Sequence, residues 1–203
     1  MISGSMARAV VLNTVLTLCV SPGIPAAQRG SLTASRNLAD LAAEAGVILR
    51  GRIVSTRVEP HPQFSALWTV VVTMQVDEAI KGQVGNTYSF RQFIWDQRDR
   101  EDAAGYQKGQ KLLLLLTAPN SNGLSSPVGL EQGRFRLSAD TAGNVYATNG
   151  RNNVGLLNGV SANAMAKGIR LAPRSAALVS PPPAGPLALD DLLTLIRQLA
   201  SVN

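Results

Sequence analysis

The alternation of apolar and polar positions predicts a mainly β chain between residues 47 and 150. Its clearest example is Trp68 to Val76, where every second residue is apolar, as in a strand with one buried face. Val47 to Val58 alternates in the same way, and Gly51 in its middle predicts a bulge or a sharp bend. Thr87 to Trp95 is rich in aromatic residues, which favour strands. These three segments predict the body of a sheet.

Further along the chain the pattern predicts a buried strand and a hairpin. Leu112 to Leu116 is apolar at every position, which favours a central strand buried on both faces. Val128 to Leu137 and Val145 to Thr148 are expected to pair around a turn at Asp140 to Asn144. Asp96 to Gln110, with charges of alternating sign, predicts a long, solvated and mobile loop.

Helical spacing appears only near the two ends of this region. A short helix is expected through Leu38, Leu41 and Ala42. An apolar stripe predicts an amphipathic helix in residues 187–203, which either docks on the sheet or protrudes to bind a partner. The segment between, Gly150 to Pro186, is rich in Asn, Gly, Ser and Pro and predicts a loose connector, in part extended polyproline.

The first residues have the three parts of an export signal. A short start carries Arg8, an apolar stretch follows over residues 9–20, and the segment Ser21 to Ala27 contains helix-breaking and small residues. The apolar stretch is shorter than the roughly 20 residues that a membrane-spanning helix needs. The chain is therefore divided into a signal peptide (1–27), a β domain (31–150), a connector (151–186) and a C-terminal helix (187–203), with no permanent membrane span after cleavage.

The composition of the chain limits the kinds of functional site that it can form. The chain of 203 residues has a net charge of +6, and its positive charge is scattered rather than gathered in a run. Its one cysteine, Cys19, lies in the predicted signal, so the mature chain is expected to have no disulfide, no thiolate metal site and no cysteine nucleophile. Its one histidine, His61, lies between two prolines in an expected turn, Glu59 to Gln63, and is interpreted as a surface residue. We therefore expect no metal, no cofactor and no enzymatic activity.

Four segments in order resemble a known group. The chain is similar to bacterial exported proteins related in shape to the netrin-like and tissue-inhibitor-of-metalloproteinase domains, which are OB-type barrels. The segments that carry the resemblance are Leu38–Gly51, Val76–Gly82, Gly109–Leu116 and Val128–Phe135. The resemblance implies a small OB-like β-barrel and an exported location. The tissue inhibitors bind the protease zinc through a disulfide-bonded N-terminal cysteine, and this chain has no cysteine for that role after the leader.

The expected function is binding without catalysis. Trp95, Arg98 and Arg100 are the predicted contact residues, because they lie where a strand opens into a loop. The partner is expected to be a protein or a polymer of the cell envelope. Nucleic acid is not expected, since export separates the chain from it and the aromatic residues of this strand alternate between two faces. The alternative function is a protease inhibitor that acts by insertion of a loop.

Overall fold

The computed structural model describes residues 33–201, and the predicted signal peptide with Cys19 lies outside this range. The strands are β1 (Val47–His61), β2 (Phe64–Lys81), β3 (Thr87–Phe93), β4 (Lys111–Leu116), β5 (Arg134–Ala139), β6 (Val145–Asn149) and β7 (Leu187–Ala188). The α-helices are α1 (Leu38–Glu44), α2 (Gln97–Glu101), α3 (Val160–Ala166), α4 (Pro173–Leu178) and α5 (Leu189–Ala200). Two short 3-10 helices occupy Ala103–Gly105 and Leu130–Gln132. The prediction of a mainly β chain with helices near both ends is confirmed.

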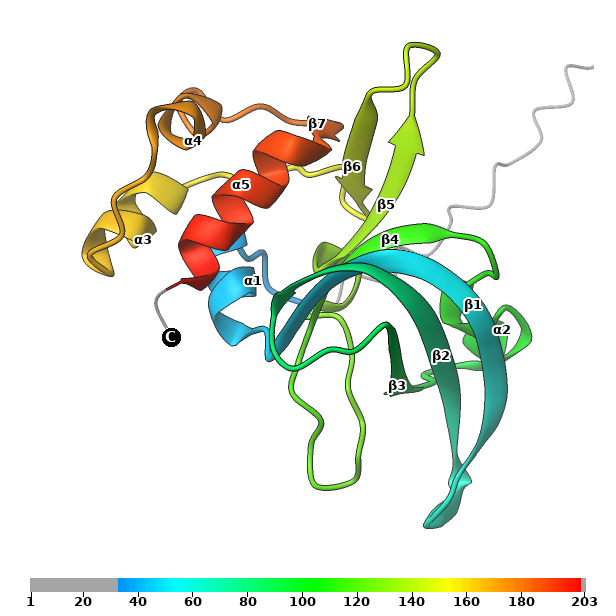
Figure 1. The fold of residues 1–203 in the computed structure, drawn as a ribbon. Helices are drawn as coiled ribbons and strands as arrows, with labels where there is room; N and C mark the ends of the chain where they lie inside the picture. The colour runs from blue at the N-terminus through cyan, green and yellow to red at the C-terminus, as the bar shows by residue number, and fades with distance from the viewer. Residues whose placement is uncertain (1–32, 202–203) are drawn as a thin grey trace, which may run out of the picture.

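The strands form one curved antiparallel sheet (Figure 1). Its order is β3-β2-β1-β4-β5-β6-β7 in a single seven-stranded sheet. The sheet is open, because its edge strands β3 and β7 are not paired with each other. A mainly β architecture is therefore confirmed, whereas the closed OB-like barrel is not.

Strand β4 lies at the centre of the sheet and contacts a separate apolar core on each side. Leu113 and Leu115 belong to the core beneath the helices, which we call the helical core. Leu112, Leu114 and Leu116 belong to the core inside the curl of β1, β2 and β3, which we call the inner core. All five side chains are 0% exposed. The prediction of a strand buried on both faces is confirmed.

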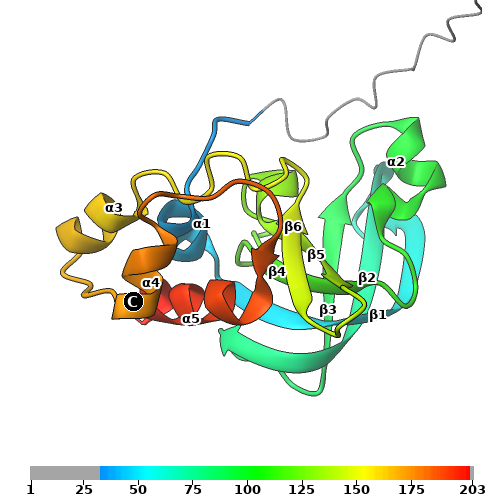
Figure 2. The same cartoon turned by 90° about the horizontal axis from the view of Figure 1, so that it is seen from above.

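The helical core is covered by the two helices that the sequence predicted. Helix α5 buries six apolar residues against the sheet and α1: Leu189, Leu192, Leu193, Leu195, Ile196 and Leu199. Figures 1 and 2 show α1 and α5 side by side on this part of the molecule. The α5 helix therefore docks on the sheet, which was one of the two alternatives that the sequence left open. Within residues 33–201, no helix is both long enough and apolar enough to span a membrane.

Gly51 allows the sheet to bend sharply, as predicted. The β1–β2 register shifts between Arg50 and Gly51, which marks a bulge. A side chain at Gly51 would overlap the carbonyl oxygen of Gln75, so only glycine allows the two backbones to approach so closely. The predicted turn at Glu59 to Gln63 was wrong in extent, because β1 continues through Pro60, which pairs with Trp68. Pro60 lies on an edge segment of the strand, where a missing N–H is tolerated.

The segment Asp96 to Gln110 is folded, which corrects the expectation of a mobile loop. It contains α2 and a 3-10 helix, and Asp96 caps α2 by accepting a hydrogen bond from Asp99 N at 2.9 Å.

Tyr106 anchors the segment in the inner core, where it is 1% exposed and donates to Gln92 Oε1 at 2.8 Å. Burial raises the pKa of Tyr106 to about 12. The buried Arg134 guanidinium lies 4.4 Å from the Tyr106 ring and donates to the carbonyl of Ala104.

The segment 151–186 is also folded, which corrects the expectation of a loose connector. Helices α3 and α4 lie in it, and Leu156, Leu157 and Val160 are buried in the helical core. Asn149 and Asn153 exchange hydrogen bonds, each side-chain oxygen accepting from the other backbone N–H at 2.8–2.9 Å. Asparagine tolerates the positive φ of 57° at position 153 and supplies the partners that a buried turn needs.

The strand predicted at Val128 to Leu137 is shorter than expected. The Val128 to Leu137 segment was expected to be one strand, but β5 begins only at Arg134 and a 3-10 helix precedes it. Gly129 begins this turn at φ 62°, and Gln132 folds back to donate from its amide to the carbonyl of Ala34 at 3.0 Å. The predicted hairpin itself is confirmed, since β5 pairs with β6 across the Asp140 to Asn144 turn.

Candidate functional site

Beyond the helices, the outward side of β1, β2 and β3 is mostly polar. Thr69 on it is buried, and its exposed residues include Arg52, Ser55, Arg57, Gln75 and Ser89. Strand pairing arranges its residues in rows, because residues directly opposite each other point to the same side of a sheet. The rows are Arg52–Gln75, Ser55–Thr73–Ser89, Arg57–Val71–Arg91 and Glu59–Thr69–Phe93, with Lys111 of β4 opposite Arg52. We call this surface, with Trp95 at its end, the open face.

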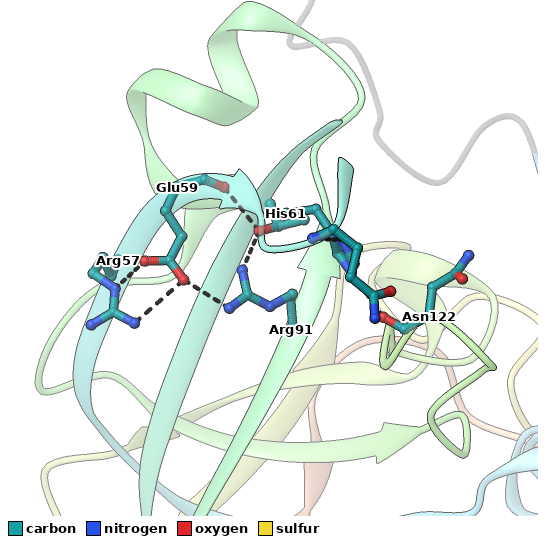
Figure 3. Close-up of polar contacts among 7 residues, drawn as sticks. Arg57, Glu59, His61, Arg91 and Asn122 are labelled. Atoms are coloured by element: carbon teal, nitrogen blue, oxygen red, sulfur yellow. Dashed lines mark hydrogen bonds and ion pairs between the residues drawn. The ribbon is translucent and has the colours of Figure 1, made fainter. Parts of the chain in front are cut away.

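Glu59 organises the end of the open face (Figure 3). Its carboxylate accepts hydrogen bonds from Arg57 on its own strand and from Arg91 Nη2 of β3 at 2.7 Å. Arg91 also donates to Thr69 Oγ1 at 2.7 Å, and Thr69 donates to the Glu59 carbonyl at 2.9 Å. Hydrogen bonds from Arg57 and Arg91 lower the pKa of Glu59, so the carboxylate stays ionised.

The two arginines differ in how much they offer to a ligand. Arg57 is 70% exposed, whereas the Arg91 side chain is 19% exposed and fixed by two neighbours. Each guanidinium has five N–H donors in a planar fork, and the contacts with Glu59 and Thr69 use only some of them. The network therefore fixes Arg91 and leaves Arg57 largely exposed, and both guanidinium groups keep donors for an anion.

His61 is buried, which corrects its interpretation as a surface residue. It is 4% exposed, and both ring nitrogens have partners. Nε2 lies 2.8 Å from the Asn122 carbonyl and Nδ1 accepts from Gln63 N at 3.2 Å, so the ring is the neutral tautomer with the proton on Nε2. Figure 3 shows this ring directed at Asn122 and away from Glu59. His61 therefore ties the β1–β2 hairpin to the loop after β4, and its contacts leave no nitrogen for a substrate or a metal.

The three predicted contact residues lie in different surroundings. Trp95 is 67% exposed, and its ring meets Phe93 edge-on at 5.1 Å between centroids. The Arg100 guanidinium lies 3.3 Å from the centroid of the Trp68 ring, on the inner-core side of β2. Arg98 is exposed on α2. Trp95 thus belongs to the open face, and Arg100 has a packing role between α2 and β2.

Sequence reasoning did not select the cations of the open face. Arg52, Arg57, Arg91 and Lys111 are scattered over 60 positions, and only the strand register brings them together. A signal was present, because each one occupies a polar position in an alternating or apolar strand. These positions can be assigned to one surface only when the pairing of the strands is known.

The chemistry of the open face is that of charge and hydrogen bonding. Among residues 33–201, no three His, Cys, Asp or Glu side chains are grouped so that they could hold a metal ion. The open face presents guanidinium and ammonium donors, hydroxyl groups and an aromatic ring.

Comparisons with known proteins add no relative to this description. No family model matches the chain, and neither a curated protein nor a solved structure matches it.

Proposed function

We propose that this protein is an exported, non-catalytic binding or scaffolding module of the cell envelope or extracellular space. The observation that carries the proposal is the open face, where a salt-bridged arginine pair and the exposed Trp95 lie on one sheet surface. Aromatic and arginine side chains fixed in advance lose little entropy on binding, which is why they dominate binding surfaces. The start of the chain, with its signal-like pattern, supports export.

The proposal includes a distant kinship of fold with the netrin-like and tissue-inhibitor domains. Supporting it, the loop 117–128 returns from β4 to β3, where Ser125 N donates to the Arg91 carbonyl at 2.8 Å and Leu124 forms a bridge with Arg91. This return partly encloses the inner core, as an OB-type barrel would. A shared fold of this kind does not imply a shared activity.

Site-specific crosslinking in the native cells tests the proposed function. A photoreactive amino acid at Ser89, on the open face, is compared with one at Met165 on α3, which is 79% exposed. We expect a crosslinked envelope component from Ser89 and none from Met165, together with an N-terminus processed near residue 28. Equal crosslinking from both positions, or an unprocessed chain in the cytoplasm, would contradict the proposal.

A second candidate function is a protease inhibitor that inserts a loop. The β1–β2 hairpin extends away from the body of the molecule, and Phe64 near its tip is 47% exposed (Figure 1). Inhibition assays against each protease class test this candidate, with Phe64→Ala as the variant and Met165→Ala as the control. Dose-dependent inhibition that Phe64→Ala removes would favour the inhibitor over the binding module.

A further inference from the structure

We propose that the open face binds an acidic polysaccharide. This inference rests on the proposed function and names its partner. Within the rows that define the open face, four cationic side chains (Arg52, Arg57, Arg91 and Lys111) accompany one carboxylate, Glu59. The next row toward the helices pairs Arg50 with Glu78 and adds no net charge. The fit to an anionic chain comes from this excess of positive charge on an otherwise polar strand surface.

Two cations of the open face are placed at a cost to stability. Arg52 lies directly opposite Lys111 on neighbouring strands, and both side chains are exposed. Like charges in directly opposite positions destabilise a strand pair. A bound anion between them would relieve this repulsion, so the pair is suited to a ligand that carries carboxylates.

A second pair is spaced across the sheet. Arg57 and Arg91 flank Val71 in one row, so their backbones are about 10 Å apart, twice the spacing of neighbouring strands. Together with Arg52 and Lys111 they form two cationic positions along β1. Separated positive positions on a broad face favour an extended polymer with repeated charges over a single small anion.

The groups between the cations suit a sugar chain. Ser55, Thr73 and Ser89 form a row of hydroxyl-bearing residues, in which the Thr73 and Ser89 hydroxyls are 2.9 Å apart. Hydroxyl groups both donate and accept, as the hydroxyls of sugars do. Trp95, exposed at the end of the face, offers an aromatic ring on which a sugar ring can lie.

Other polyanions fit this surface less well. Single-stranded nucleic acid is held by successive aromatic platforms, and on the open face Trp95 is the one aromatic side chain that is highly exposed. Interfacial membrane binding uses a broad apolar face beside the cations. The centre of the open face instead carries hydroxyl-bearing and charged residues.

Binding of the purified full chain to polygalacturonate tests the proposal, with uncharged dextran as the comparison polymer. The variant Arg52→Gln/Lys111→Gln removes two charges from the open face. The control Lys167→Gln/Arg170→Gln removes the same charge from the exposed segment after α3. Thermal unfolding of each variant verifies that it is folded.

We expect the open-face variant to bind polygalacturonate roughly tenfold more weakly, the control to bind as the parent chain does, and salt to weaken binding. Trp95→Ala is expected to weaken binding as well, without changing its dependence on salt. Equal losses in the two double variants, equal binding of dextran, or binding only to phosphatidylglycerol vesicles or to a single-stranded oligonucleotide would overturn the proposal. Crosslinking from Ser89 to an envelope protein alongside such a result would leave the proposed binding function standing and remove only the polysaccharide.

Discussion

The two halves of one sheet surface differ in what lies over them. On the outward side of β1 and β4, Ile48 and Leu115 face each other and are fully buried beneath α1 and α5. A few residues along the same strands, Arg52 and Lys111 face each other on the same side and are exposed. The β1–β4 pairing keeps one register between these two residue pairs, although β1 bends at Gly51. The helices therefore decide which half is core. The covered half is expected to govern stability and the open half to govern binding.

The largest effect should come from the covered half. Leu115→Ala removes a fully buried side chain from the helical core and should lower the free energy of unfolding by about 2–5 kcal/mol. The comparison is Val71→Ala, at the centre of the open half, which should cost less than about 1 kcal/mol because the residue is partly exposed. Chemical denaturation measures both. Similar losses at the two positions would show that the open half is also covered.

Unfolding at high pH tests whether water is excluded from the inner core, which lies on the other side of the sheet from the open half. The pKa of Tyr106 is about 12 in the folded chain, above the ordinary value of 10.0 for a tyrosine, because burial disfavours the charged form. This stability is fully present below pH 10 and is lost as the pH rises toward 12, by about 3 kcal/mol. The free energy of unfolding, measured from pH 9 to 12, should fall by this amount. In Tyr106→Phe the part of the fall that is due to Tyr106 should be absent. Titration of Tyr106 near its ordinary pKa would mean that water reaches the inner core.

The bend between the two halves should depend on Gly51. A methyl group there overlaps the backbone of β2, so Gly51→Ala should destabilise the chain by about 1–3 kcal/mol. Gly85→Ala is the matched control, since its nearest neighbour would be 3.8 Å away, an ordinary contact. Thermal unfolding distinguishes the two. A loss of stability equal to that of Gly85→Ala would show that the strands separate easily at the bulge.

The smallest effect on stability should have the opposite sign. Lys111→Glu replaces a like-charge pair with an opposite-charge pair across from Arg52 and should stabilise the chain by roughly 0.2–1 kcal/mol. The same change should weaken polygalacturonate binding, because it reverses a charge of the open face. Denaturation and binding measured on one preparation would show the two effects together. A destabilised variant would mean that Lys111 is needed for folding rather than for binding.

Local pattern was a reliable guide wherever burial repeats along the chain. The run Leu112 to Leu116 predicted a central strand, and both of its sides are filled by apolar cores. The apolar stripe predicted an amphipathic helix with docking as one of two alternatives, and α5 docks with its apolar residues buried. Of the predicted contact residues, Trp95 lies on the open face, and its role in binding remains a prediction.

Composition was a poor guide where single residues have particular tasks. The Asn- and Gly-rich start of the segment 151–186 was interpreted as loose, yet Asn153 is fully buried and its amide donates to the carbonyls of Ala147 and Gly185. Asp96 to Gln110 was interpreted as a mobile loop, yet it contains two short helices and is anchored by Tyr106. In both segments a few buried polar or aromatic contacts, distant in sequence, replace a repeating apolar pattern.

The sequence by itself determined most of the strands, the two terminal helices of the described region and the glycine at the bend, because these depend on periodicity and on backbone freedom. The tertiary structure alone decided the burial of His61, the folding of the segment after β6 and the gathering of Arg52, Arg57, Arg91 and Lys111 on one surface. Each of these depends on which residues strand pairing and packing place next to one another. A one-dimensional pattern specifies which side of its own strand a residue occupies, whereas its neighbours come from the register of other strands.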